Sequence, residues 1–329
     1  MEHAAGERPV SEESVCVAAP AKLNLFLHVT GRRADGYHTL ESVMVMLDFG
    51  DRLTLSVRGD GRIELANPIP GVAPGDDLTF RAARLLQSHA RIARGVTIAL
   101  DKRIPMGAGM GGGSSDAASV LLALNRLWDA RLTRDELMRL GLQLGADVPF
   151  FIFGVNAHVT GIGETLREVS VPRLNVLIEI PPVHSATRDV FAAGSLVRDT
   201  PPSGASAFGL GYGCNDLQPV ALAKHGAIRT ALNALDAVDF GDAKRAALTR
   251  ARMTGSGAAV FRIVDRAFPG SSQAWRAAGT SERDAWKLLQ RLHYRSPRLH
   301  DASGAPIAGS TVVHAQVIPA HPLRDFVAK

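Results

Sequence analysis

Residues 105–118 read PMGAGMGGGSSDAA and contain five glycines, which two serines follow directly. Because glycine lacks a side chain, its backbone approaches a ligand closely and adopts positive φ, so successive amide N–H groups can converge on an anion. Apolar residues from Ala117 to Trp128 recur at helical spacing, and the start of a helix adds unpaired amides and a positive dipole end. We therefore predict a phosphate-binding loop, with Ser114 and Ser115 able to donate to phosphate or to contact Mg²⁺.

Two other phosphate-binding schemes fit this stretch less well. Gly107, Gly109 and Gly112 satisfy the G-x-G-x-x-G pattern of dinucleotide-binding folds. That pattern needs an acidic residue at the end of a second parallel strand, whereas Asp129 follows a predicted helix. The Walker A pattern needs a lysine where Gly113 stands. A glycine loop that caps a helix needs neither residue.

The elements before the loop can be read from composition and apolar spacing. Residues 14–66 are rich in β-formers and predict strands separated by turns. One predicted turn is the tripeptide DFG at 48–50, which also occurs in protein kinases but has no accompanying H-R-D sequence here. Residues 77–93 predict a helix, and residues 95–100 predict a strand that leads into the glycine loop.

Helix-start signals follow the loop. We predict a buried helix whose N-cap is Ser114 or Ser115, with Asp116 in its first turn, and a second helix capped by Thr133. Further along, residues 214–236 have the pattern of one helix. Residues 252–264 predict a strand, a tight glycine loop and another strand.

Composition limits the class of protein. The chain has 329 residues, of which 46% are hydrophobic and 21% charged, as in a soluble globular protein of about two domains. The net charge of +5 suits acidic substrates such as nucleotides but is equally compatible with a generic basic surface. Two cysteines without a CxxC spacing support neither a disulfide framework nor a thiolate metal site. No run of basic residues with interleaved aromatics predicts nucleic-acid binding.

The ends and apolar runs of the chain suggest a location. The N-terminal sequence is polar and lacks the pattern of a secretory signal, and no apolar run reaches membrane-spanning length. We therefore expect a cytoplasmic protein without membrane contact, and a disordered extension at residues 1–13.

Three segments resemble the motifs of the GHMP kinases, the superfamily of galactokinase, homoserine kinase, mevalonate kinase and phosphomevalonate kinase. PMGAGMGGGSS resembles motif 2, APAKLNLFLHVTGRRADGYHTLESVM resembles motif 1, and RMTGSGAAVF resembles motif 3. PAKLNL, ADGYH, GGGSSDAA and LGADVPFF together resemble one family within it, the 4-diphosphocytidyl-2-C-methyl-D-erythritol kinases of the non-mevalonate isoprenoid pathway. The resemblance covers residues 15–261 and resumes near the C-terminus.

The resemblance implies an α+β fold of two domains with the active site in the cleft between them. The first domain, at 14–156, is expected to resemble a ribosomal-protein domain, and the second, at 157–329, a ferredoxin-like α/β domain. The chain is longer than is usual in the family, and residues 266–280 and 295–310 are interpreted as insertions. Whether the protein is a monomer or a homodimer stays open.

The resemblance also assigns catalytic roles. Phosphoryl transfer to an alcohol requires positioning, charge stabilisation and a group that accepts the hydroxyl proton. Alternation along a strand from Pro20 places Lys22 and Asn24 on one face. Asp147, in LGADVPFF, matches the catalytic aspartate of the family, and Lys22 is expected to orient it. A solvated lysine and a helix-capping aspartate are the simpler alternatives.

ATP and Mg²⁺ are implied as cosubstrate and metal, with Ser115 a possible metal ligand and Asp116 a weaker candidate. An aromatic ring beside a hydrogen-bonding group suits a nucleobase, so Tyr37 is expected to stack on cytosine and His38 to bond its edge. Phe191 could instead be an ordinary core residue. The implied ATP-binding residues are Pro105, Met106, Gly107, Ala108, Gly109, Met110, Gly111, Gly112, Gly113, Ser114 and Ser115. The implied substrate-binding residues are Asn24, Tyr37, His38, Thr187 and Phe191, and the motif 3 loop comprises Thr254, Gly255, Ser256 and Gly257.

Two alternatives remain at this point. The chain could be a GHMP kinase for a different alcohol, or a non-catalytic relative that binds ligand and regulates a partner. The Tyr37-His38 pair argues against the first alternative. The presence of Lys22, Asp147 and the glycine loop argues against the second.

Overall fold

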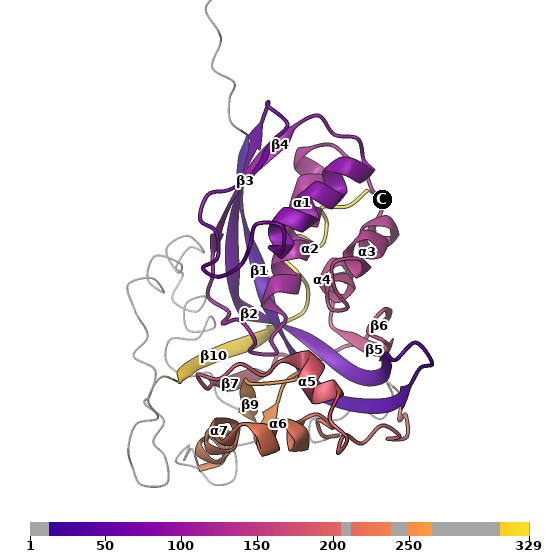
Figure 1. Ribbon diagram of the computed structural model, residues 1–329, viewed down its shortest axis with the longest axis vertical. Helices are drawn as coiled ribbons and strands as arrows, with labels where there is room; N and C mark the ends of the chain where they lie inside the picture. The colour runs from indigo at the N-terminus through magenta and orange to yellow at the C-terminus, as the bar shows by residue number, and fades with distance from the viewer. Residues whose placement is uncertain (1–12, 205–211, 238–248, 265–309, 329) are drawn as a thin grey trace, which may run out of the picture.

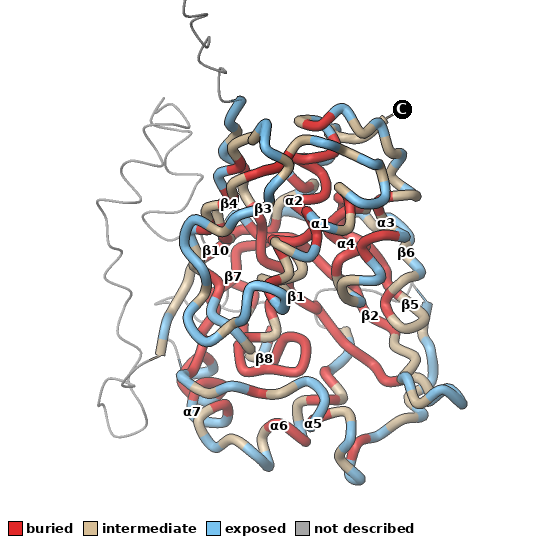
Figure 2. Tube along the Cα trace, turned by 45° about the horizontal axis from the view of Figure 1, so that its top comes forward, coloured by how far each residue is buried: buried red, intermediate tan, exposed pale blue. Residues whose placement is uncertain are grey.

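A computed structural model describes residues 13–204, 212–237, 249–264 and 310–328. Two long antiparallel strands dominate it (Figure 1): β1 (Ser14–Arg32) and β2 (His38–Arg58), joined by a turn at Asp35-Gly36. Most residues in the middle of both strands are buried, which Figure 2 shows as long red stretches of tube. The two strands therefore form a long hairpin through the interior, and this hairpin can hold site residues in fixed positions.

The first half of the chain packs helices on one face of this sheet. β3 (Ile63–Leu65) and β4 (Gly95–Asp101) extend the sheet beyond β2. Helices α1 (Leu78–His89), α2 (Gly112–Leu127), α3 (Arg134–Leu142) and α4 (Val148–Phe153) cover it (Figure 1). Their apolar sides share one core with β1, β2 and β4. α2 lies in the middle of this core, and its N-terminus follows the glycine loop.

The second half is built on β7 (Asn175–Ile180), which pairs with β9 (Val260–Val264) and β10 (Thr311–Ile318). β8 (Arg252–Met253) pairs with β9. The remaining elements are α5 (Thr187–Phe191), α6 (Gln218–Lys224) and α7 (Gly226–Ala237). β10 also pairs with β2 through Val317 and Ile318, so one continuous sheet runs through both halves.

A hairpin of β5 (Ala157–Gly161) and β6 (Thr165–Glu168) pairs with β2. The predicted division at residue 156 would separate this hairpin from the strand that binds it, whereas a division by sheet pairing falls after Glu168. The predicted extension lies outside the described residues except for Glu13, and the predicted insertions lie outside them except for Ser310. Within the described ranges, no helix combines the length and apolar character needed to cross a membrane.

Two elements predicted from the sequence, a turn and a single helix, were wrong. The DFG tripeptide is not a turn, because β2 continues through it. A Cβ on Gly50 would lie 2.2 Å from the Ala19 carbonyl oxygen, so this glycine permits the close approach of β1. The helix predicted for residues 214–236 is broken at His225, whose backbone is extended (φ −134°). Helical spacing continues on both sides of this break, so periodicity could not reveal it.

The start of α2 also differs from the prediction. Its N-cap is Gly111, in the left-handed conformation with φ 71°, and the helix begins at Gly112. Ser114 and Ser115 therefore lie inside the first turns rather than at the cap, and Asp116 lies beyond the first turn. A bare left-handed cap leaves the first helical amides free of any side-chain partner. The Thr133 cap of α3 is confirmed, as a capping box with Glu136.

Candidate active site

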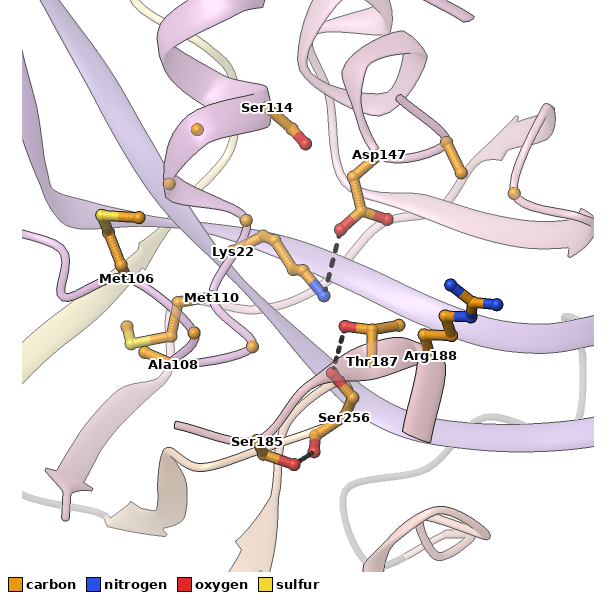
Figure 3. A pocket seen from close by; sticks show the side chains of 18 of the residues that line it. Lys22, Met106, Ala108, Met110, Ser114, Asp147, Ser185, Thr187, Arg188 and Ser256 are labelled. Atoms are coloured by element: carbon orange, nitrogen blue, oxygen red, sulfur yellow. Dashed lines mark hydrogen bonds and ion pairs between the residues drawn. The ribbon is translucent and has the colours of Figure 1, made fainter. Parts of the chain in front are cut away.

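A cleft of about 1240 Å³ lies where the two halves meet, and Figure 3 shows its wall. One side is formed by the glycine loop, Lys22 and Asp147, and the other by residues 185–192 and 255–257. All of the site residues predicted from the sequence line this cleft except Ser115 and Thr254. Segments far apart in the chain are therefore brought to one cavity, as a cleft site between two halves requires.

The glycine loop is held by backbone bonds to both halves. The Lys22 amide donates to the Met110 carbonyl (2.9 Å), and the Ala258 and Ala259 amides donate to the Gly107 and Ala108 carbonyls (3.1 and 3.0 Å). Gly109 (φ 72°) faces motif 3 so closely that a Cβ there would lie 2.4 Å from the Thr254 oxygen. At this position glycine therefore serves the packing of two loops as well as the approach of a ligand.

Lys22 and Asp147 form an ion pair in the cleft, with 3.5 Å between Lys22 Nζ and Asp147 Oδ2 (Figure 3). The Lys22 side chain is 4% exposed, whereas that of Asp147 is 32% exposed. Asp147 stands before α4 as its N-cap but makes no side-chain capping bond. Its carboxylate is thus free to meet a ligand while the buried lysine holds it.

Asn24 lines the cleft, and its side-chain amide forms hydrogen bonds with two other side chains. Lys22 Nζ donates to Asn24 Oδ1 at 2.6 Å, and Asn24 Nδ2 donates to Ser42 Oγ at 2.8 Å. Ser42 Oγ in turn donates to the Phe26 carbonyl. This chain of bonds fixes the ammonium of Lys22, so Asn24 supports the lysine.

A register shift between Asn24 and Phe26 changes the predicted alternation of β1. Simple alternation from Pro20 would place Phe26 on the face of Lys22 and Asn24, opposite Leu23 and Leu25. Phe26 instead packs in the same apolar cluster as Leu23 and Leu25, while Leu27 belongs to another. A β-bulge of this kind redirects side chains without a signal in the apolar pattern.

Residues 37, 38 and 191, which are predicted to bind the nucleobase, all line the cleft. Tyr37 is 62% exposed, so packing of the turn does not account for its ring. The His38 and Phe191 rings, from the two halves, lie 5.0 Å apart between centroids. Thr187 Oγ1 lies 2.7 Å from Ser256 Oγ and so links α5 to motif 3. The two predicted substrate segments therefore meet at one place.

A charge cluster beside the glycine loop, two of whose members line the cleft, was not predicted from the sequence. Lys102 Nζ forms ion pairs with Asp51 and with Asp116, the latter at 3.0 Å. Burial raises the pKa of Asp116, against the attraction of Lys102. The cluster joins the chain just before the loop to α2 just after it, and it occupies Asp116, which was a candidate for the metal. No motif predicted it, because its three members lie on separate elements.

Two arginines of the cleft region were also missed. Arg188 follows Thr187 and lines the cleft (Figure 3). Among the residues that the structure describes, no hydrogen bond or ion pair engages its guanidinium group. Arg198 donates a hydrogen bond to His38 but does not itself line the cleft. Neither lies in one of the three GHMP motifs, and their spacing gave no independent signal.

Another group of possible metal ligands, His28, Cys214 and Asp216, lies outside the cleft lining. Asp216 Oδ2 accepts bonds from the Val29 amide (2.8 Å) and the Thr200 hydroxyl (2.7 Å). The carboxylate therefore has a structural role in holding residues 200 and 216 against β1.

Known proteins resemble this chain in sequence and fold. The family model "GHMP kinases N terminal domain" matches residues 77–155. A protein of Thiobacillus denitrificans named 4-diphosphocytidyl-2-C-methyl-D-erythritol kinase is 49% identical over 82% of this chain and 97% of its own length. A protein of the same name from Ralstonia nicotianae is 51% identical over 76% of this chain and 85% of its own length.

A crystal structure of 4-(cytidine 5'-diphospho)-2C-methyl-D-erythritol kinase superimposes with a TM-score of 0.67 and 28% identity, over 92% of this chain and all of that one. Homoserine kinase from Cytophaga hutchinsonii has the same fold, with a TM-score of 0.57 and 15% identity, over 96% of this chain and 98% of its own. Fold, motifs and identity over most of the chain agree, so this α+β protein belongs to the GHMP kinases and, within them, to the 4-diphosphocytidyl-2-C-methyl-D-erythritol kinase family.

Proposed function

We propose that this chain transfers the γ-phosphoryl group of ATP to the 2-hydroxyl of 4-diphosphocytidyl-2-C-methyl-D-erythritol, in the non-mevalonate route to isoprenoid precursors. The observation that carries the proposal is the Lys22–Asp147 pair, 3.5 Å apart, in one cleft with the glycine loop and with Tyr37, His38 and Phe191. A kinase for this substrate needs those parts together: a phosphate cradle, a proton acceptor and a nucleobase pocket.

Asp147 accepts the proton of the substrate's 2-hydroxyl. The hydroxyl oxygen attacks the γ-phosphorus of ATP, and the bond from that phosphorus to the oxygen that leaves with ADP breaks. Lys22 holds the carboxylate in place and balances negative charge near the attacking oxygen. The free amides at the start of α2 and in the glycine loop hold the phosphates of ATP. The 32% exposure of Asp147 leaves its carboxylate open to the hydroxyl.

Mg²⁺ belongs to the proposal because it takes oxygen ligands and neutralises phosphate charge. Ser115 Oγ is buried and outside the cleft lining, whereas the Ser114 hydroxyl points toward the side of the cleft that holds Asp147 (Figure 3). We therefore assign Ser114, rather than Ser115, as the serine that would hold the ion together with phosphate oxygens.

Arg188 supplies a further cation for phosphate. Both substrates carry phosphates, and a guanidinium group binds phosphate oxygens in a two-pronged geometry. Its neighbours on α5 lie close to other parts of the site: Thr187 contacts Ser256 of motif 3, and Phe191 contacts His38. We expect Arg188 to contact the diphosphate that joins the two parts of the substrate.

The proposal is tested by measuring ADP release with ATP and each of four alcohols: the cytidyl substrate, mevalonate, homoserine and galactose. Turnover with the cytidyl substrate alone supports the proposal. Faster turnover with another alcohol would make the chain a different GHMP kinase. Binding of the cytidyl substrate and ATP without any ADP release would make it a non-catalytic relative.

A further inference from the structure

Arg198, in the loop that follows α5, contacts His38, which is predicted to bind the nucleobase. Its Nε donates to His38 Nε2 at 3.0 Å. Its other nitrogens donate to three backbone carbonyls, those of Phe191 (3.1 Å), Ala193 (2.7 Å) and Leu196 (2.9 Å). All three nitrogens of the guanidinium group are engaged, so its orientation toward His38 is fixed.

This contact determines where His38 carries its proton. An arginine nitrogen can only donate, so His38 Nε2 must accept and must carry no hydrogen. The ring is then neutral with its proton on Nδ1, because the charged imidazolium has no accepting nitrogen. Among the described residues, none bonds Nδ1, and His38 lines the cleft. His38 therefore lines the cleft with a hydrogen-bond donor, Nδ1–H, that no described residue uses.

The surroundings of His38 favour this neutral form. Burial lowers the pKa of His38, and the charges of Arg198 and of Arg32, on β1, lower it further. Phe191, from α5, contributes an uncharged ring on another side.

We propose that Arg198 is a positioning residue that fixes His38 as a donor toward the nucleobase and thereby selects cytosine over uracil. The inference rests on the proposed function. Cytosine N3 is an acceptor and can receive the Nδ1 hydrogen. Uracil carries a hydrogen on N3, so two donors would face each other there, and a site that pairs with one group rejects an analogue that cannot pair.

Two substitutions separate this role from a structural one. In Arg198→Gln, the amide nitrogen Nε2 occupies the chain position of arginine Nε and can still donate to His38. In Arg198→Met, a methyl group takes that position and cannot donate. Both variants lose the other two guanidinium nitrogens, which serve the three carbonyls. A purely structural role predicts equal effects in the two variants. Arg229→Met, on the exposed side of α7 and away from the cleft, is the matched control.

The first measurement is the ¹⁵N chemical shifts of His38 in the full chain near pH 7.5, without substrate. We expect a protonated Nδ1 and a bare Nε2 in the wild type and in Arg198→Gln, and a mixture of tautomers in Arg198→Met. The second is kcat/KM for the cytidine and uridine forms of the diphospho-methylerythritol substrate. We expect the preference for cytidine to fall about 10-fold or more in Arg198→Met, the loss typical of one ligand hydrogen bond, and less in Arg198→Gln.

A wild-type His38 with its proton on Nε2 would overturn the inference. So would equal loss of cytidine preference in the Met and Gln variants, or an unchanged preference in both. A wild type that phosphorylates neither substrate would refute the proposed function instead, while the ¹⁵N shifts would still decide the tautomer.

Discussion

Lys22 shows how a site residue depends on its neighbours. A lysine in a strand is ordinarily a solvated charge, but the side chain of this one is 4% exposed and has two partners, Asn24 and Asp147. Sequence motifs predicted that Lys22 and Asp147 act together. The bond from Asn24 to Ser42 that steadies the lysine could not be predicted, because the pairing of β1 and β2 includes a bulge that alternation does not reveal.

Tyr37 gives a prediction for a single side chain. If its exposed ring stacks on cytosine, Tyr37→Ala should weaken binding of the cytidyl substrate by ~1–3 kcal/mol, and Tyr37→Phe should weaken it far less. The affinity for ATP and the melting temperature should stay nearly constant, because the ring is 62% exposed. Calorimetric titration with each ligand provides the measurement. An equal loss for both ligands together with a lower melting temperature would favour a packing role.

At the scale of elements, the glycine loop and motif 3 act as one unit. The backbone bonds between them join residues 107–108 to 258–259. Gly109→Ala places a Cβ 2.4 Å from the Thr254 oxygen and forces a residue with a side chain to adopt φ 72°. We expect ATP affinity to fall by about 10-fold or more, because the amides of the loop would be displaced.

The matched control for this variant is Gly59→Ala. It lies in the turn after β2, where no atom lies within 4 Å of the new Cβ and φ is not in the left-handed region. ATP affinity in Gly59→Ala should equal that of the wild type. An unchanged affinity in Gly109→Ala would show that the close packing of the two loops is not needed for binding ATP.

Element type was predictable where the local signals were strong, as for α1, α3 and β4. Long-range features were not. The DFG tripeptide gave a turn signal, yet pairing with β1 keeps β2 extended through it. The cap of α2 depends on a left-handed glycine, whereas serine is the commoner sequence signal for a cap. In both cases tertiary packing decided between local options of similar energy.

At the scale of the whole molecule, the C-terminal segment returns to the first half. The His321 amide donates to the Gly154 carbonyl (2.9 Å), and Arg134 donates to the Arg324 carbonyl (2.5 Å). The His321 ring is buried between Ser119 of α2 and the Leu323 amide. Such contacts across the chain lie beyond what residue spacing can predict.

Burial lowers the pKa of His321 to about 3, with Arg134 adding to the effect. Because an unfolded histidine titrates near ~6.5, the unfolded state binds the proton first as the pH falls. The contribution of His321 to the free energy of unfolding should therefore be fully present above pH ~6.5. Below that pH the free energy of unfolding should decline by up to ~1.4 kcal/mol per pH unit, until the pH reaches the folded pKa.

His321→Asn keeps an acceptor for the Leu323 amide but removes the titration. Urea unfolding between pH 7 and 4.5 should show a lower stability at pH 7 and a shallower decline than in the wild type. Parallel curves for the two proteins would mean that His321 does not carry the acid sensitivity.

We propose that Asp147, held by Lys22, accepts the hydroxyl proton during phosphoryl transfer. The single-turnover rate of phosphate transfer from ATP to the cytidyl substrate in Asp147→Asn measures this role. We expect this rate to fall roughly 10²–10⁴-fold, with both ligands still bound and the melting temperature close to that of the wild type. A rate within about fivefold of the wild type, measured with both ligands saturating, would contradict the assignment of Asp147 as the base.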